Sequence, residues 1–254
     1  MESGKRIEFL TAEETYDKNN AEVIYWTDFF LNESKKKNVF INIQEVLSTK
    51  NNFTTAQVFA GVWHEFTRFV PGFLTRAVII ANEPEWQHYF IQIAYDELGG
   101  RDIENIHSRL FEKIIDQEKI TFHLDKNRYQ ITHVLDEITG DLNNSTTLYE
   151  IGGLLLSFEI VAEQNIEMLF TGLCYKEDLK NSLSESKFFK IHRTNESEHI
   201  RHSIADYIRL CKEDHEKRQF CLSFDKGLQF WQRFWDQMAR LALAEDIGAS
   251  TSLA

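Results

Sequence analysis

Apolar residues along this chain recur mainly at intervals of three and four, the spacing of one face of an α-helix. No stretch alternates with a period of two for long enough to predict a β-strand. The pattern therefore predicts an all-α fold, a bundle of roughly seven to nine helices. We expect residues 1–254 to form a single domain, with residues 1–12 disordered or loosely attached.

The breaks in the apolar pattern set the ends of the predicted helices. Pro71 disfavours helical geometry in the residue before it, so one helix is expected to stop at Val70. Pro84 suits a helix start, and Gly99–Gly100 suits a helix end. Residues 120–141 show no clear period and are predicted as loop or short helix. The predicted helices cover about 20–37, 39–47, 54–69, 73–81, 84–98, 103–119, 146–172, 188–214 and 224–244.

Composition narrows the classes of partner. A net charge of −12, with no patch of Lys and Arg, argues against a nucleic-acid or anionic-membrane partner. Three cysteines without a CxxC pair argue against a disulfide framework and a structural zinc site. There is no apolar run of about 18 residues and no signal-peptide pattern at the start. The sequence thus predicts a cytoplasmic, reduced protein, and its 20 Phe and 5 Trp predict an aromatic interior.

Three polar residues interrupt the apolar face of the helix predicted over 188–214. His192, Glu196 and His199 stand at i, i+4 and i+7, which places them within roughly 60° of one another on a helix. Polar groups on a core-facing stripe are costly unless something binds them. The trio therefore predicts part of the ligand set of a first-row transition metal. A solvent-facing stretch over residues 193–202 is an equally compatible interpretation.

A fourth candidate ligand lies within an apolar segment earlier in the chain. Glu159 stands inside residues 154–161, where a carboxylate would be costly without a cation or hydrogen bonds. Glu163 follows one helical turn later on the same side and is the alternative.

Two more candidates flank a predicted turn. Glu97 closes one helix, and His107 stands in the first turns of the next. Gly99–Gly100 between them lets the two helices fold back, so that both side chains can meet. Glu85 and His88 form a second Glu-x-x-His pair and are the runner-up for these first ligands.

Three carboxylates and three imidazoles match the ligands of carboxylate-bridged di-iron sites in helical bundles. As an ordered set these residues resemble the haem-oxygenase-like di-iron oxidases and oxygenases, which share the fold of haem oxygenase, thiaminase and pyrroloquinoline-quinone synthase. The similarity spans about Pro71 to Ile208. It rests on Asp96-Glu97-Leu98-Gly99-Gly100 through His107-Ser108-Arg109-Leu110-Phe111, on Glu159 followed by Gly172-Leu173, and on His192-x3-Glu196-x2-His199. The chain departs from the family at position 196, where the family usually has Asp and the longer arm of Glu alters the geometry at the second iron.

The resemblance implies a haem-oxygenase-like bundle whose metal ligands are Glu97, His107, Glu159, His192, Glu196 and His199. It implies two iron ions cycling between Fe²⁺ and Fe³⁺, with O₂ as co-substrate and no catalytic groups beyond the ligands. The substrate would be a small molecule such as an amino acid or fatty acid, which undergoes N-oxygenation, desaturation or C–C cleavage. An external electron donor and a homodimer are compatible with this function. We expect an aromatic substrate pocket lined by Trp63, Phe66, Tyr95 and Phe158.

Two other functions remain open on the same fold. One is a metal-free enzyme that acts on a thiamin-like or quinone-precursor molecule. The other is a protein-interaction adaptor, since one branch of the family is associated with binding proteins.

Overall fold

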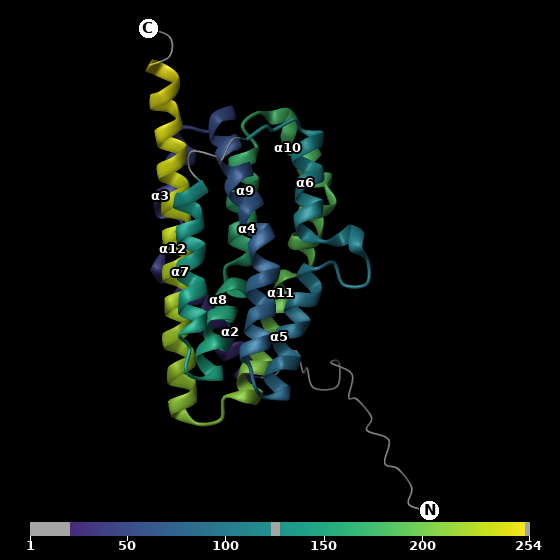
Figure 1. Cartoon of the computed structure of the whole chain (residues 1–254), viewed down its shortest axis with the longest axis vertical. Helices are drawn as coiled ribbons and strands as arrows, with labels where there is room; N and C mark the ends of the chain where they lie inside the picture. The colour runs from purple at the N-terminus through teal and green to yellow at the C-terminus, as the bar shows by residue number, and fades with distance from the viewer. Residues whose placement is uncertain (1–20, 123–127, 252–254) are drawn as a thin grey trace, which may run out of the picture.

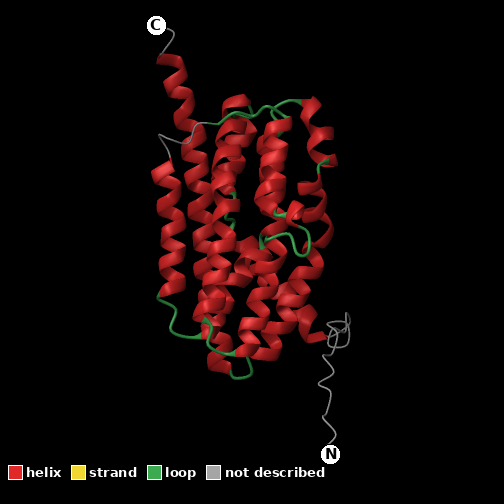
Figure 2. Ribbon diagram, turned by 45° about the vertical axis from the view of Figure 1, so that its right-hand side comes forward, coloured by secondary structure: helices red, strands yellow, loops and turns green. Residues whose placement is uncertain are grey.

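The computed structural model describes residues 21–122 and 128–251, without the side chains of residues 194–199 and 245–251. All regular structure within these ranges is helical, as predicted (Figure 2). The expectation for residues 1–12 lies outside the described part of the chain.

The described ranges hold twelve helical elements, eleven α-helices and one 3₁₀ helix, so the prediction of seven to nine was too low. The predicted helices 103–119 and 146–172 are each divided in two, and the predicted helices 54–69 and 73–81 are joined in one. One further helix, over 128–143, forms largely within residues 120–141, predicted as loop or short helix, and one forms over 177–185, where none was predicted. The elements are α2 (Ala21–Lys37), α3 (Ile41–Thr49), α4 (Phe53–Ile80), α5 (Pro84–Glu97), η1 (Ile103–Asn105), α6 (His107–Gln117), α7 (Arg128–Asn143), α8 (Leu148–Ile160), α9 (Ala162–Leu173), α10 (Glu177–Glu185), α11 (Lys187–Leu210) and α12 (Asp214–Thr251).

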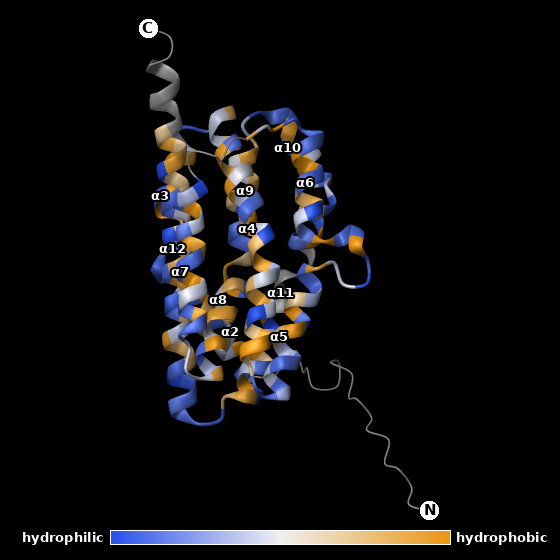
Figure 3. Cartoon of the chain, viewed as in Figure 1, coloured by the Kyte–Doolittle hydropathy of each residue, from blue (hydrophilic) through white to orange (hydrophobic). Residues whose placement is uncertain are grey.

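The longest helix, α12, runs the length of the bundle along one side (Figure 1). It packs most extensively against α8 and also contacts α3, α4 and α7. The helices alternate between hydrophobic and hydrophilic faces, as an amphipathic bundle requires (Figure 3). Inside, Trp231 and Trp235 are almost fully buried, and the Trp235 indole donates a 2.9 Å hydrogen bond to Asn165.

Glycines let α8 and α12 approach each other closely. A Cβ at Gly153 would lie 2.9 Å from the backbone nitrogen of Phe224 and closer still to the carbonyl oxygen of Phe220. A Cβ at Gly227 would overlap the side chain of Ser157 on α8. The two helix backbones are therefore in near contact, and this contact fixes the position of α8.

The prediction that a helix ends at Val70 was wrong, because α4 continues through Pro71 to Ile80. Proline removes one backbone hydrogen bond, at a cost of about 3 kcal/mol inside a helix. The apolar face continues on both sides, however, with Val70, Phe73 and Leu74 all buried. Burial of each such side chain stabilises the fold by roughly 1.5–3 kcal/mol, so the combined stabilisation exceeds the cost of the proline.

The apolar segment predicted as one element over 146–172 is interrupted at Val161, where the backbone leaves helical geometry (φ −101°, ψ 2°). The segment therefore forms two helices, α8 and α9. Among the described residues, none of the helices combines the length and apolar character that crossing a bilayer requires.

Candidate metal centre

The turn between α5 and α6 brings Glu97 and His107 together. Gly99 (φ 85°) and Gly100 (φ 61°) both adopt left-handed geometry and end α5, as the sequence predicts. The following loop folds tightly over Gly99, where a Cβ would lie only 2.6 Å from the backbone nitrogen of Ile106. His107 then begins α6 directly opposite the end of α5.

The contact between Glu97 and His107 suits two ligands of one cation. His107 Nδ1 lies 3.0 Å from Glu97 Oε2, and both side chains are largely buried. The nitrogen nevertheless lacks the alignment of a hydrogen bond, and it remains a buried polar atom without one. Two donor atoms that bind one metal at right angles, at roughly 2.1 Å each, are themselves about 3 Å apart.

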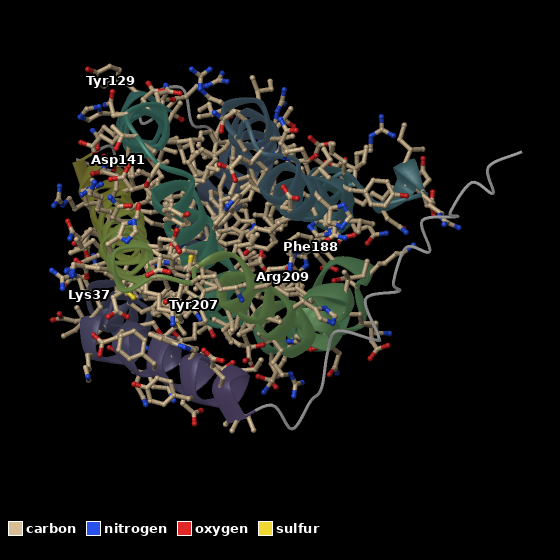
Figure 4. The ribbon with its side chains drawn as sticks, turned by 90° about the horizontal axis from the view of Figure 1, so that it is seen from below. Lys37, Tyr129, Asp141, Phe188, Tyr207 and Arg209 are labelled. Carbon is tan, nitrogen blue, oxygen red and sulfur yellow. The ribbon has the colours of Figure 1, made fainter. Side chains whose placement is uncertain are left out.

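The third candidate, His192, faces His107 across the contact between α6 and α11. The centroids of the two imidazole rings are 4.5 Å apart. Below them Phe111 and Phe188, each four residues from its histidine, pack at 5.2 Å, and Figure 4 shows Phe188 on the inner side of α11. His192 Nδ1 donates a 2.7 Å hydrogen bond to the Phe188 carbonyl. This bond places the lone pair of the neutral ring on Nε2, the arrangement that metal-binding histidines commonly show.

Glu159 occupies the last turn of α8, immediately before the break at Val161. Its side chain is only partly exposed. In the described part of the chain, no residue forms a hydrogen bond or an ion pair with its carboxylate. A carboxylate in the interior is unfavourable unless a cation or a donor compensates its charge.

The electrostatics link Glu159 to the Glu97–His107 pair. Burial, together with the nearby charges of Glu97 and Asp96, raises the pKa of Glu159 to about 7, while His107 acts to lower it. Burial acts to lower the pKa of His107, but the charge and contact of Glu97 outweigh it, so the net pKa of His107 is raised. The contributions of neighbouring carboxylates to both shifts indicate excess negative charge at this centre, which a bound cation would compensate.

The predicted ligand set is only partly assembled by the described side chains. His107 contacts Glu97 on one side and faces the His192 ring on the other, and Glu159 lies within electrostatic reach of Glu97 and His107. Among the described side chains, no group of three or more His, Cys, Asp or Glu is arranged to hold a metal ion. The side chains of Glu196 and His199 lie outside the description, so their role stays a prediction, although α11 carries both backbones.

The alternative ligands lie on outer faces of their helices. Glu163 is exposed in the first turn of α9, because the break at Val161 turns this helix away from the direction of Glu159. Glu85 and His88 are both exposed on α5, where His88 Nε2 contacts the Gln92 amide at 3.1 Å. Their positions favour Glu159, Glu97 and His107 over these alternatives.

Three of the four predicted pocket residues gather in one aromatic layer, and the fourth does not. Trp63 and Phe66 of α4 are buried with ring centroids 4.9 Å apart, and Phe66 stacks on Phe158, the neighbour of Glu159. The placement of Tyr95 in this layer was wrong, since its side chain is 47% exposed. Tyr95 precedes Glu97 by two residues, or roughly 200° around the helix, so both cannot point inward.

We predict that Gly99→Ala weakens metal binding and destabilises the fold. The substitution introduces a Cβ into left-handed geometry and against the backbone of Ile106, so the loop that sets the Glu97–His107 distance must shift. Urea unfolding should show that the free energy of unfolding of the variant is about 2 kcal/mol lower than that of the wild type. The matched control is Gly72→Ala in α4, where a Cβ meets no atom within 4 Å. Equal stability of the Gly99→Ala variant and the wild type would contradict this role for the turn.

Comparisons with known proteins agree with this architecture. A family model described as an iron-containing redox enzyme matches residues 62–232. Two crystal structures of a CADD-like protein of unknown function from Nostoc punctiforme share the fold, with TM-scores of 0.71 and 0.67 and 13% sequence identity each. They cover 87% and 88% of this chain, which in turn spans 98% and 97% of theirs. No curated protein matches the chain.

Proposed function

Because the chain belongs to the iron-containing redox enzyme family, we propose that it is a non-haem di-iron oxidase or oxygenase that uses O₂ to oxidise a small substrate. Glu97, His107, Glu159 and His192 would bind the iron together with Glu196 and His199. The substrate would be a small molecule such as an amino acid or fatty acid.

The observation that carries the proposal is the carboxylate of Glu159, which has no hydrogen bond or ion pair among the described side chains. It lies within electrostatic reach of a second carboxylate, Glu97, and of an imidazole, His107, whose buried Nδ1 has no aligned hydrogen bond. Carboxylates and imidazoles together are the donors that iron accepts in helical bundles. A divalent cation there would compensate the excess negative charge and give each of these donor atoms a partner.

The remaining residues of the centre orient these donors and exclude water. The hydrogen bond from His192 to the Phe188 carbonyl fixes the ring and its tautomer. Phe111 and Phe188 close the centre on the α6–α11 side, and the aromatic layer of Phe66 and Phe158 lies beyond Glu159. Iron bound in this setting would supply the redox chemistry, while the apolar walls favour a substrate with apolar groups.

Anaerobic reconstitution with Fe²⁺ followed by metal analysis tests the proposal. We expect two irons per chain in the wild type and an absorbance change when O₂ is admitted. A wild-type protein that binds well under two irons, and whose absorbance does not respond to O₂, would contradict the proposal. Enzymatic activity that survives removal of iron would instead favour a metal-free enzyme on the same fold.

Histidine substitutions give a matched pair for the same measurement. His107→Ala should lose at least one iron, because it removes a buried donor at the Glu97 contact. His88→Ala, an exposed histidine on α5, should bind as much iron as the wild type. If His88→Ala loses iron and His107→Ala does not, the Glu85–His88 pair rather than the Glu97–His107 pair holds the metal.

A further inference from the structure

Arg193 joins α11 to α9 at the position directly after the proposed ligand His192. Its Nε donates a 2.7 Å hydrogen bond to Glu167 Oε1, and its Nη2 donates a 3.3 Å hydrogen bond to Glu167 Oε2. The guanidinium carbon also lies 4.2 Å from the centroid of the Phe170 ring and 5.7 Å from that of Phe189. One side chain therefore makes a two-point ion pair and a cation–π contact with the same helix, α9.

Two neighbouring stripes of α11 face two different helices. Phe188 and His192 form the stripe that contacts α6. Phe189 and Arg193, each one residue later, form the stripe that contacts Phe170 of α9, where the two phenylalanine rings meet edge to face at 5.2 Å. Successive residues lie about 100° apart around a helix. Contacts with α6 and α9 together therefore determine how α11 is rotated about its own axis.

The partner helix α9 is itself held firmly in the bundle. A Cβ at Gly172 would overlap the ring of Phe59, so α9 lies in close contact with α4. On the same helix, the buried Asn165 amide oxygen accepts the 2.9 Å hydrogen bond from Trp235 of α12. Because α9 is fixed against both α4 and α12, its contact with Arg193 constrains the rotation of α11.

We propose that Arg193 is a positioning residue of the metal centre, which holds α11 in the rotation that brings His192 to His107. The proposal rests on the proposed metal-binding function. The two imidazole rings are 4.5 Å apart, and a rotation of α11 would carry the His192 ring along the surface of α6, away from His107. The same helix carries the predicted ligands Glu196 and His199 in the next two turns. Arg193 would thus orient half of the predicted ligand set through one contact.

Arg193→Met tests the proposal, because it keeps an apolar stem and removes the guanidinium. The measurement is an anaerobic titration of the full-length protein with Co²⁺, followed by its visible absorption. We expect the affinity for Co²⁺ to fall about fivefold, with an altered absorption spectrum of the bound metal. The unfolding temperature of the metal-free variant should change little, because side chains 31% and 45% exposed form an ion pair that contributes little to stability. A lower unfolding temperature with unchanged affinity and spectrum would show a merely structural role and overturn the proposal.

Two further variants separate the parts of this contact. Arg193→Lys keeps the charge but not the planar fork, so its affinity for Co²⁺ should lie between those of the wild type and Arg193→Met. Glu167→Gln removes the charge on α9 and leaves Arg193 over the Phe170 ring, so it should weaken binding in the same direction but less strongly. Glu167→Gln decides the question if Arg193→Met fails to fold. Wild-type affinity and spectrum in both Arg193→Met and Glu167→Gln would overturn the positioning role and leave the metal centre intact.

Arg209→Met is the matched control. Arg209 stands in the last turn of α11 and donates hydrogen bonds of 3.0 and 3.2 Å to Asp206 of the same helix. The substitution therefore removes a guanidinium from α11 without removing an ion pair between helices, and the variant should bind Co²⁺ as the wild type does. Equal losses in the Arg193→Met and Arg209→Met variants would overturn the proposal. A wild-type protein that binds no Co²⁺ would instead overturn the proposed function, and the positioning role with it.

Discussion

Glu159→Gln is expected to stabilise the metal-free protein at pH 8 by roughly 3 kcal/mol and to remove metal binding. The free-energy estimate follows from the pKa of Glu159, which is raised from 4.5 to about 7 chiefly by burial. Above pH 7 the folded wild type must hold an ionised carboxylate whose charge is disfavoured by burial and by the charges of Glu97 and Asp96. Glutamine occupies nearly the same volume without the charge.

The pH dependence of the stability gained in Glu159→Gln shows whether the ionised carboxylate is its cause. Because the folded-state pKa of Glu159 is the higher one, the folded protein binds more protons than the unfolded chain between pH 4.5 and 7. The stability of the metal-free wild type should therefore fall as the pH rises through this window. The raised pKa of His107 acts in the same sense, since its favourable charge is lost as the pH rises. In the Glu159→Gln variant, stability should fall with rising pH only to the extent that His107 causes it.

Urea unfolding of the metal-free protein at pH 4.5 and at pH 8 measures the change in stability. Metal analysis after Fe²⁺ loading measures the loss of metal binding. The control is Glu163→Gln, which neutralises an exposed carboxylate four residues later in the chain. It should change neither stability nor iron content appreciably. An equal gain in the Glu163→Gln variant would show that overall negative charge, and not this centre, sets the stability. A Glu159→Gln variant that still binds two irons would remove Glu159 from the ligand set.

Gly153→Ala should be strongly destabilising. The added Cβ would overlap the Phe220 carbonyl and lie 2.9 Å from the nitrogen of Phe224. Both are backbone atoms of α12, so no rotamer change relieves the overlap and the two helices must separate. Overpacking commonly costs 1–3 kcal/mol, and a backbone clash belongs at or above the upper end, about 3 kcal/mol.

Thermal unfolding should show a fall of roughly 10 °C for Gly153→Ala, by the usual relation for a chain of this size. The control is Gly140→Ala in α7, where a Cβ meets nothing within 4 Å. This control should raise stability by up to about 1 kcal/mol, since alanine is the better helix former. Because α8 carries Glu159, Gly153→Ala should also weaken metal binding. Wild-type stability of Gly153→Ala would mean that α8 and α12 are farther apart than described.

The sequence was most informative where local chemistry determines the geometry. Glycine at two consecutive left-handed positions predicted both the end of α5 and the meeting of Glu97 with His107. The apolar context of Glu159 likewise predicted an interior carboxylate that needs a partner. In each case the residues that decide the outcome are neighbours in sequence.

Predictions that depend on packing between distant segments were weaker. The break at Val161, which separates Glu159 from Glu163, has no proline or glycine to mark it.

Pro71 has one further consequence for the aromatic layer beside Glu159. Since proline has no amide hydrogen, the Thr67 carbonyl has already lost the donor that an uninterrupted helix would give it. Bending α4 at this point therefore sacrifices no main-chain bond there. Phe66 lies before the proline and Phe73 after it, and both stack on Phe158. A small change in the angle of α4 would widen or narrow this wall, so under the proposed function Pro71 would influence which apolar substrates fit beside Glu159.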